Sequence, residues 1–426
     1  MIQCNILLIT YLSIFIFRSL FKLGLDSLNI SHLNRNADNI PRVFKNAIDK
    51  GKFYKIARYT SDSTKFEIIS QIFDELLILL ILLTGFLPWL VELIKSCNVY
   101  FVFEGLIFFA ALAFISNLFD IPFSLYHTFV IENRYGFNTK TFKMWALDLI
   151  KGIALSFLLG GIVLFFLLLL LRYMENYWWF LAWIILSVFE LIIMWLYPIV
   201  IAPIFNKFEP IGDNELTDKI INLMSKAGLG VKGVFQMDAG IRSKHTNAYF
   251  TGLGKTKRIV LFDTLLKSHP HNEILSILAH ETGHWVKRHI IKQMILMEIV
   301  SFFGLLIIAK LMEWDLIYQT FGIAKEQSSY VGLFLVPTLL SPIIYFLNPI
   351  GSAISRKFEK EADTVGVSLT GDVSSMINAL IKLSAENLSN LVPHRIYAWF
   401  NYSHPAPVER IERLESMEGN IEEKTM

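Results

Sequence analysis

Long apolar stretches alternate with polar segments along the chain. A helix needs roughly 20 apolar residues to cross about 30 Å of hydrocarbon. Stretches of this length lie near residues 3–22, 69–94, 100–119, 150–172, 177–203, 291–312 and 329–349. The pattern therefore predicts an all-α membrane protein with seven transmembrane helices.

The first polar segment between spans is strongly basic. It carries Arg35, Arg42, Lys45, Lys50, Lys52, Lys55, Arg58 and Lys65. Cytoplasmic loops of membrane proteins have an excess of lysine and arginine, so we place this segment in the cytoplasm. Residues 204–290 and the region from Gly351 then lie on the same side of the membrane.

The apolar stretch Ile6–Phe17 is expected to stay in the protein as the first span. A secretory signal peptide has basic residues before its apolar region. Here none precedes the stretch, whereas Arg18 and Lys22 follow it.

Two polar regions have the patterns of folded, soluble structure. In the first, helices are predicted at 214–227 and from about Glu273, with extended segments at 233–238 and 258–265. In the second, helices are predicted at 354–369, 374–388 and 408–417, before a polar tail with no expected structure.

These patterns divide the chain into four parts. We expect a membrane region with five spans, a cytoplasmic segment, a membrane hairpin and a second cytoplasmic segment, at residues 1–203, 204–290, 291–350 and 351–426. A cytoplasmic active site would have to combine two pieces that the hairpin separates in sequence.

Composition supports a membrane protein and excludes several other classes. Hydrophobic residues make up 54% of the chain, and 39 Lys and Arg nearly balance 37 Asp and Glu, so no global field favours a nucleic acid partner. Cys4 and Cys97 are the only cysteines, which excludes a disulfide framework and a cysteine-built zinc site. Whether these two pair with each other is open.

The second predicted helix of residues 204–290 contains the sequence HETGH. Because residues four apart share a helix face, His280 and His284 can both bind one ion, with Glu281 beside them to hold a metal-bound water. This geometry is typical of catalytic zinc sites. The alternative is an ordinary helix with two surface histidines.

A catalytic zinc needs a third protein ligand, and Glu359 is the best candidate. In the segment Ser355–Asp363, Glu359 and Asp363 share a predicted helix face, whereas Glu361 is expected to point to the opposite side. Asp363 is then positioned to accept the second N–H of a histidine ligand. The alternative is a solvated, charged helix.

Several longer segments resemble the type I CAAX prenyl proteases, which are integral-membrane zinc endopeptidases that trim prenylated proteins and peptides. Besides HETGH and FEKEAD, the matching segments are ENRYGFNTKT (Glu132–Thr141), YPIVIAPIFNKFEPI (Tyr197–Ile211), HTNAYFTG (His245–Gly252), KRIVLFDTLL (Lys257–Leu266) and SHPAPVERI (Ser403–Ile411). The resemblance extends from about Glu132 to the end of the chain.

The resemblance implies seven transmembrane helices that enclose a water-filled chamber, and a small α+β zinc-protease domain on the cytoplasmic side. It implies one Zn²⁺ per chain, held by His280, His284 and Glu359, with Glu281 as the base. By position, Asn247 matches a residue that holds the substrate backbone, His404 a catalytic histidine beside the metal, and Arg410 an arginine that supports the site and substrate binding.

One departure from the family pattern concerns the origin of the chain. Eukaryotic members carry a long charged insertion before HExxH, whereas here only Lys267–His271 and a short helix start intervene. This predicts a compact bacterial relative in the inner membrane; a eukaryotic relative would lie in the endoplasmic reticulum membrane.

The most favoured function is a zinc-dependent membrane endopeptidase in which Glu281 activates a zinc-bound water. Its partners would be the lipid bilayer and a peptide or protein substrate, prenylated or membrane-associated. The main alternative is a membrane-protein quality-control zinc protease of the heat-shock type, although members of that group have fewer spans. A transporter would account for acids within spans, but not for HETGH beside FEKEAD.

One of these acids, Glu298, follows the HExxH segment in the sixth span. If one unbroken helix joins His284 to Glu298, the two side chains are about 40° apart around its axis. We therefore hypothesise that Glu298 faces a hydrated chamber.

Overall fold

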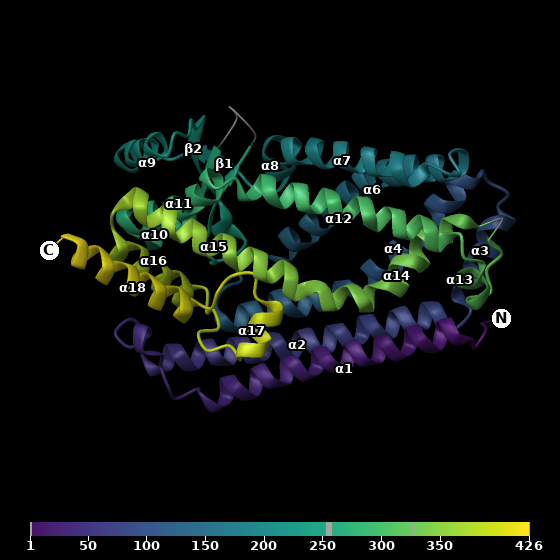
Figure 1. Cartoon of the computed structure of the whole chain (residues 1–426), viewed down its shortest axis with the longest axis horizontal. Helices are drawn as coiled ribbons and strands as arrows, with labels where there is room; N and C mark the ends of the chain where they lie inside the picture. Colours follow the sequence, from purple (N-terminus) through teal and green to yellow (C-terminus); the bar gives the residue numbers. More distant parts are fainter. Residues whose placement is uncertain (1, 253–257, 326–327, 426) are drawn as a thin grey trace.

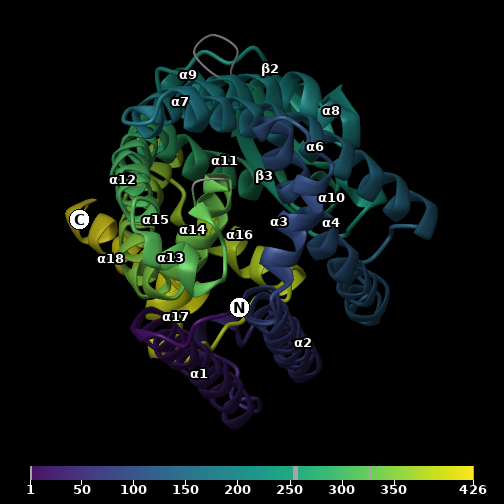
Figure 2. The same cartoon turned by 90° about the vertical axis from the view of Figure 1, so that its right-hand side faces the viewer.

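The computed structural model describes residues 2–252, 258–325 and 328–425. Long helices run side by side along the molecule, and a smaller mixed region lies at one end of them (Figure 1). Viewed from the opposite end, the long helices form a ring (Figure 2). The two termini lie at opposite ends of the long axis, which agrees with an odd number of spans (Figure 1).

The long helices coincide with the predicted spans. The helices of this region, together with the short helices that extend them, are α1 (Ile6–Arg35), α2 (Lys50–Leu83), α3 (Phe86–Ser96), α4 (Phe101–Tyr126), α5 (Asn133–Tyr135), α6 (Phe142–Tyr173), α7 (Trp178–Leu196), α8 (Ala202–Phe205), α12 (His289–Met312), α14 (Gly332–Ile344) and α15 (Asn348–Thr370). Turns of π-helix join α4 to α5 and α7 to α8, and a 3₁₀ turn joins α14 to α15.

Six helices of the described residues are long and apolar enough to cross a membrane, and there are seven spans if a bent pair is counted as one. The pair is α2 and α3, which meet at an angle of 61°. Gly85 lies at the bend with φ of +82°, a left-handed conformation that costs glycine little. Six of the predicted spans are therefore confirmed as helices of sufficient length, and the seventh, at 69–94, corresponds to the bent pair.

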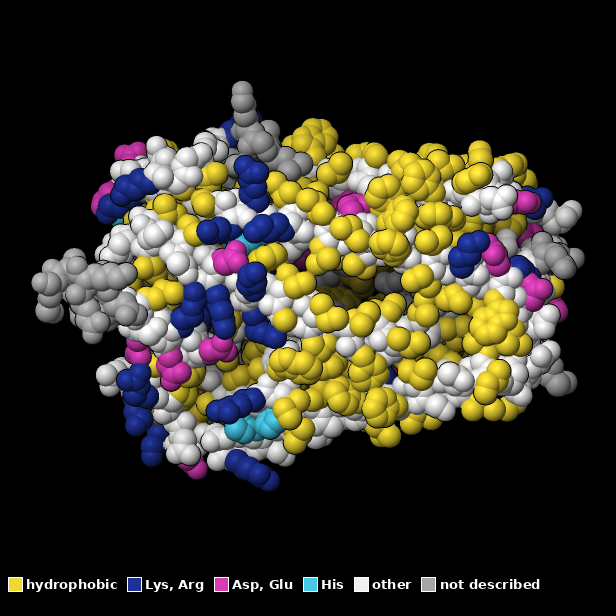
Figure 3. Space-filling model, in the orientation of Figure 1, with side chains coloured by type: hydrophobic (Ala, Val, Ile, Leu, Met, Phe, Trp, Pro, Cys, Tyr) yellow, Lys and Arg dark blue, Asp and Glu magenta, His cyan; other side chains and the backbone are white. Residues whose placement is uncertain are grey.

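The outer surface of these helices is apolar. Large side chains along α6, such as Phe157 with 72% of its surface exposed, have no protein covering them. Figure 3 shows hydrophobic side chains over the long helices and charged ones gathered toward the end that carries the mixed region, with an opening between the helices on this face. Such a surface is suited to lipid, whereas Tyr318, Tyr330 and Phe108 are buried in the interior.

The mixed region contains a four-stranded sheet in the order β1-β2-β4-β3. Its elements are β1 (Phe208–Pro210), α9 (Asn214–Lys226), β2 (Gly233–Met237), β3 (Ala248–Thr251), β4 (Arg258–Phe262), α10 (Asp263–Ser268) and α11 (His271–Val286). β2 and β4 are parallel, and the outer strands are antiparallel to them. Lys257, the first residue of the KRIVLFDTLL segment, lies outside the described residues.

The sequence prediction missed two strands, β1 and β3, which are short and lie at the sheet edges. It also extended the last strand to residue 265, whereas α10 already begins at Asp263. A strand of three or four residues is too short to give a clear alternation of apolar and polar positions.

The C-terminal segment adds helices around the sheet. They are α16 (Val373–Glu386), α17 (Arg395–Asn401) and α18 (Pro407–Thr425), while a short helix, α13 (Asp315–Thr320), lies between α12 and α14. The prediction of an unstructured tail was wrong, because α18 continues to Thr425.

The helix with HETGH does not continue unbroken into the membrane. Arg288, with φ of +56°, separates α11 from α12. The rotation that would align Glu298 with His284 is therefore lost. Ser187 of α7 donates a hydrogen bond of 2.5 Å to Glu298 Oε2, so Glu298 lies at the α7–α12 contact, where it is partly exposed.

Cys4 and Cys97 are both exposed free thiols. The structure therefore has no disulfide between them.

Candidate metal centre and active site

The HETGH sequence lies in the last turns of α11. Ile274, Leu278 and Ala279 of this helix are buried in the core beneath the sheet. This packing fixes the rotation of α11 and directs His280 and His284 toward α15. The helix begins after Pro270 with no side-chain cap.

Small residues allow α11 and α15 to approach closely. A Cβ atom on Gly283 would lie 2.6 Å from the carbonyl oxygen of Ala362, and one on Gly366 would lie 3.1 Å from the backbone nitrogen of His280. Ala362 is itself fully buried. The short distance between the two helices brings the side chain of Glu359 to the histidines.

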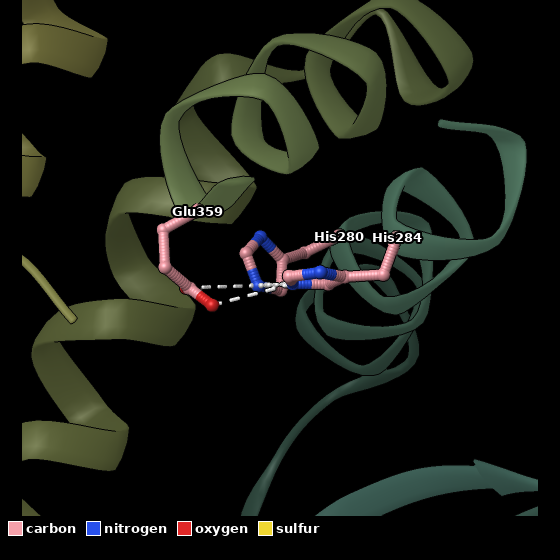
Figure 4. Close-up of side chains that lie close together, drawn as sticks. All are labelled: His280, His284 and Glu359. Atoms are coloured by element: carbon pink, nitrogen blue, oxygen red, sulfur yellow. Dashed lines mark hydrogen bonds and ion pairs between the residues drawn. The ribbon is translucent and has the colours of Figure 1, made fainter. Parts of the chain in front are cut away.

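His280, His284 and Glu359 point toward one another (Figure 4). His280 Nε2 lies 3.3 Å from His284 Nε2 and 3.3 Å from Glu359 Oε2, and His284 Nε2 lies 3.3 Å from Glu359 Oε1. The carboxylate faces His280 through Oε2 and His284 through Oε1. One ligand atom from each of the three residues lies within 4.8 Å of the others, which is close enough for all three to bind one zinc ion and leave a position for water.

Glu359 has the environment of a metal ligand rather than of a surface carboxylate. Only 3% of the residue is exposed. His404 Nδ1 lies 2.9 Å from Glu359 Oε2. Even so, Oε2 accepts no hydrogen bond of acceptable geometry from the described residues. A buried carboxylate oxygen without a donor is costly, and a bound cation would compensate it.

Asp363 lies one turn after Glu359 and contacts His280 as predicted. His280 Nδ1 lies 2.8 Å from Asp363 Oδ1, and Arg410 donates hydrogen bonds to both Asp363 oxygens. Burial and Arg410 oppose protonation of His280, but hydrogen bonds with Asp363 and Glu359 raise its pKa above the ordinary value. Metal binding at Nε2 would therefore displace a proton.

We expect Gly283→Ala to lose most of its zinc. The added methyl group would overlap the backbone of Ala362, so α11 and α15 would have to separate by a few tenths of an ångström or more. Metal content after purification would measure the effect. Gly351→Ala is the control, since the new methyl group, also on α15, meets no atom within 4 Å. Equal zinc content in the two variants would contradict the proposed role of the close approach.

Two family models match consecutive parts of the chain. Residues 29–207 match the model described as CAAX prenyl protease N-terminal, five membrane helices, and residues 210–418 match peptidase family M48. A crystal structure of S. mikatae Ste24p superimposes with a TM-score of 0.86 at 32% identity, over 94% of this chain and 99% of that one. The chain belongs to the CAAX prenyl protease family.

Similar full-length proteins come from eukaryotes. CAAX prenyl protease 1 of Saccharomyces cerevisiae is 33% identical, with 88% of each chain covered, and its human homologue is 30% identical, with 90% of each covered. The predicted bacterial origin is therefore unsupported. The short connection before HETGH, on which it rested, is compatible with alignment over most of these eukaryotic chains.

This member of the CAAX prenyl protease family is an integral multi-pass membrane protein and a zinc metallopeptidase with a His-His-Glu candidate site. The family match extends over the N-terminal membrane helices as well as the protease segment. That extent disfavours the heat-shock type of quality-control protease, whose members have fewer spans.

The other family-matched residues lie at different distances from the centre. The exposed ring of His404 contacts Glu359 and also lines a cavity of about 940 Å³. Arg410 contacts Asp363 and His280 and thereby supports the metal site. Asn247 is exposed just before β3, and within the described residues it accepts hydrogen bonds from the backbone N–H groups of Ala248 and Phe262.

Two matched segments serve to join the protease region to the membrane helices. Glu132 accepts a hydrogen bond of 2.7 Å from Tyr59 of α2, and its other oxygen lies 3.2 Å from His245 Nε2. The ring of His245 stacks on Phe137 at 3.9 Å. In the sequence, Glu132, Phe137 and His245 were identified only as parts of family motifs. The structure was needed to show that they contact one another.

Proposed function

We propose that this chain is a zinc endopeptidase that hydrolyses prenylated peptides at the cytoplasmic face of a membrane. It would bind one zinc ion per chain through His280, His284 and Glu359, with Glu281 as the general base. The observation that carries this proposal is the convergence of His280, His284 and Glu359, each of which offers a ligand atom within 4.8 Å of the other two. Three protein ligands are what a catalytic zinc uses, with one position left for water or substrate.

A zinc ion held here would polarise the scissile carbonyl and lower the pKa of a water in the open position. Glu281 precedes the buried Thr282 on the same helix as both histidine ligands. From that place its carboxylate takes a proton from the attacking water and passes it to the leaving amine. Asp363 holds the His280 ring with Nε2 free to bind metal.

Two further residues are assigned to the substrate. His404 is exposed, lies against Glu359 and lines the 940 Å³ cavity, so it is positioned to donate to the developing oxyanion. Asn247 leads into β3, a strand at the sheet edge that packs against α11. An extended peptide could pair with the free edge of β3, with Asn247 holding its backbone.

The topology and the division of the chain are part of the same proposal. The basic segment after α1 and the metal site lie on the cytoplasmic side, and the four parts at 1–203, 204–290, 291–350 and 351–426 correspond to two membrane and two cytoplasmic pieces. The eukaryotic relatives favour the endoplasmic reticulum membrane over a bacterial inner membrane.

We expect a farnesylated peptide to be cleaved at least about tenfold faster, in kcat/KM, than the same peptide without the lipid. A tenfold difference in kcat/KM requires about 1.4 kcal/mol. Burial of only two methylene groups of the lipid would contribute about 1.6 kcal/mol, which is enough. The measurement uses the purified chain in detergent, with both peptides well below KM.

The Glu281→Gln variant is the control for contaminating proteases. Equal kcat/KM values for the two peptides would contradict the prenyl preference and would favour a general membrane protease.

A further inference from the structure

We propose that Glu361 and His289 form a hydrogen-bond relay that orients His284 and strengthens zinc binding. The proposal rests on the zinc site described above, because it assigns His284 as a ligand through Nε2. It corrects the expectation that Glu361 points away from the centre as a bystander. Glu361 is not one of the three converging ligands, but its carboxylate reaches the metal site through another side chain.

The relay is continuous from the ligand to the carboxylate. His289 Nδ1 lies 3.1 Å from His284 Nδ1, and His289 Nε2 lies 3.0 Å from Glu361 Oε2. His289 is 1% exposed, so solvent does not compete for these contacts. The distances place both nitrogens of the His289 ring in hydrogen bonds.

Metal binding would fix the direction of both hydrogen bonds. His284 must present an unprotonated Nε2 to zinc, so its proton is on Nδ1 and is donated to His289 Nδ1. The proton of neutral His289 is then on Nε2, where Glu361 accepts it. A carboxylate only accepts, so Glu361 selects the single arrangement in which His284 is ready to bind metal.

The backbone and a neighbouring aromatic ring hold His289 in this position. Arg288 adopts a left-handed conformation, which ends α11 and turns the next residue back toward His284. The His289 ring stacks on Phe358 with centroids 4.2 Å apart and planes 10° from parallel. Because Phe358 directly precedes Glu359, the same turn of α15 supplies a metal ligand and the platform for the relay.

Each of the two histidine ligands is thereby oriented by a carboxylate, but by a different route. His280 donates directly to Asp363, which is 1% exposed and paired with Arg410. His284 is supported through an intervening imidazole, and the side chain of Glu361 is 31% exposed. Since solvent partly replaces an exposed acceptor, removing Glu361 should cost less than removing Asp363.

The test compares Glu361→Ala with Glu361→Gln and with Glu415→Ala. Glu415 is a matched control, because its side chain is 38% exposed and it pairs with Arg42 on the surface. Zinc affinity is measured by chelator competition on the purified full-length chain, and the visible absorption of the Co²⁺-loaded protein reports the ligand geometry. We expect Glu361→Ala to weaken zinc about tenfold and to change the Co²⁺ spectrum.

Glutamine at 361 should restore most of the affinity, because its carbonyl oxygen can accept the hydrogen bond from His289 Nε2. Glu415→Ala should leave both readouts unchanged. Thermal unfolding of the metal-free variants checks the fold, and unchanged midpoints would assign the loss to the relay. His289→Phe, which keeps the stacking on Phe358 but cannot accept from His284, should weaken zinc at least as much as Glu361→Ala.

Unchanged zinc affinity in Glu361→Ala, or equal losses in the alanine and glutamine variants, would overturn the relay. The Glu359→Ala variant separates this failure from a failure of the proposed function. If Glu359→Ala loses zinc while Glu361→Ala does not, the metal site stands and only the relay is wrong. If Glu359→Ala retains zinc at wild-type affinity, the metal site itself is wrong and the relay falls with it.

Discussion

Replacement of Glu281 by glutamine is expected to lower turnover by roughly two to four orders of magnitude while zinc remains bound. Glutamine has nearly the shape of glutamate but cannot take a proton from the attacking water. The three ligand atoms belong to other residues, so the metal site stays intact. Turnover of a farnesylated peptide and zinc content, measured on the same preparation, check the expectation.

Glu415→Gln is the control for this substitution. Glu415 is an exposed residue that pairs with Arg42, so its loss should leave turnover unchanged. Near-normal activity in Glu281→Gln would refute the assignment of Glu281 as the base. Loss of zinc together with activity would show instead that Glu281 supports metal binding.

The second large effect is expected at Glu359. Glu359→Ala should weaken zinc by about 100-fold or more, beyond the range of outer contacts, since it removes one of three ligands. Its removal also leaves His280 and His284 with only two donors for the ion. Chelator competition measures the change, and activity at limiting zinc should fall in parallel.

Because Glu359 is buried beside Arg410, its replacement also changes local charge. Glu359→Gln keeps the side-chain volume and serves as the second variant if the alanine variant unfolds. We expect zinc affinity to be highest in the wild type, lower in Glu361→Ala and lowest in Glu359→Ala. Equal affinity in the two alanine variants would show that the wrong carboxylate was identified as the ligand.

Sequence pattern was sufficient for the membrane helices. A span must satisfy its backbone hydrogen bonds internally and present apolar side chains to lipid, so its length and composition are visible in any window of about 20 residues. For the same reason the seven spans were located without knowledge of their neighbours. The bend at Gly85 was not predicted, because a single glycine and a nearby proline do not show how far a helix turns.

The sequence also identified the candidate metal ligands, since helical spacing determines which side chains share a face. His280 with His284, and Glu359 with Asp363, are pairs four residues apart on two helices. That these helices lie side by side was a hypothesis at that point. The structure confirmed it through a contact that only Gly283 and Gly366 permit.

Only the tertiary structure showed which side chain Glu361 contacts. Helical spacing placed Glu361 away from the face of Glu359 but could not show that His289, beyond a break in the helix, would reach it. The same break at Arg288 invalidated the inference about Glu298, because it assumed one continuous helix. Spacing along the sequence determines which side chains lie close together on one helix. Relations between helices depend on the turns and close contacts that join them, and these are decided by packing.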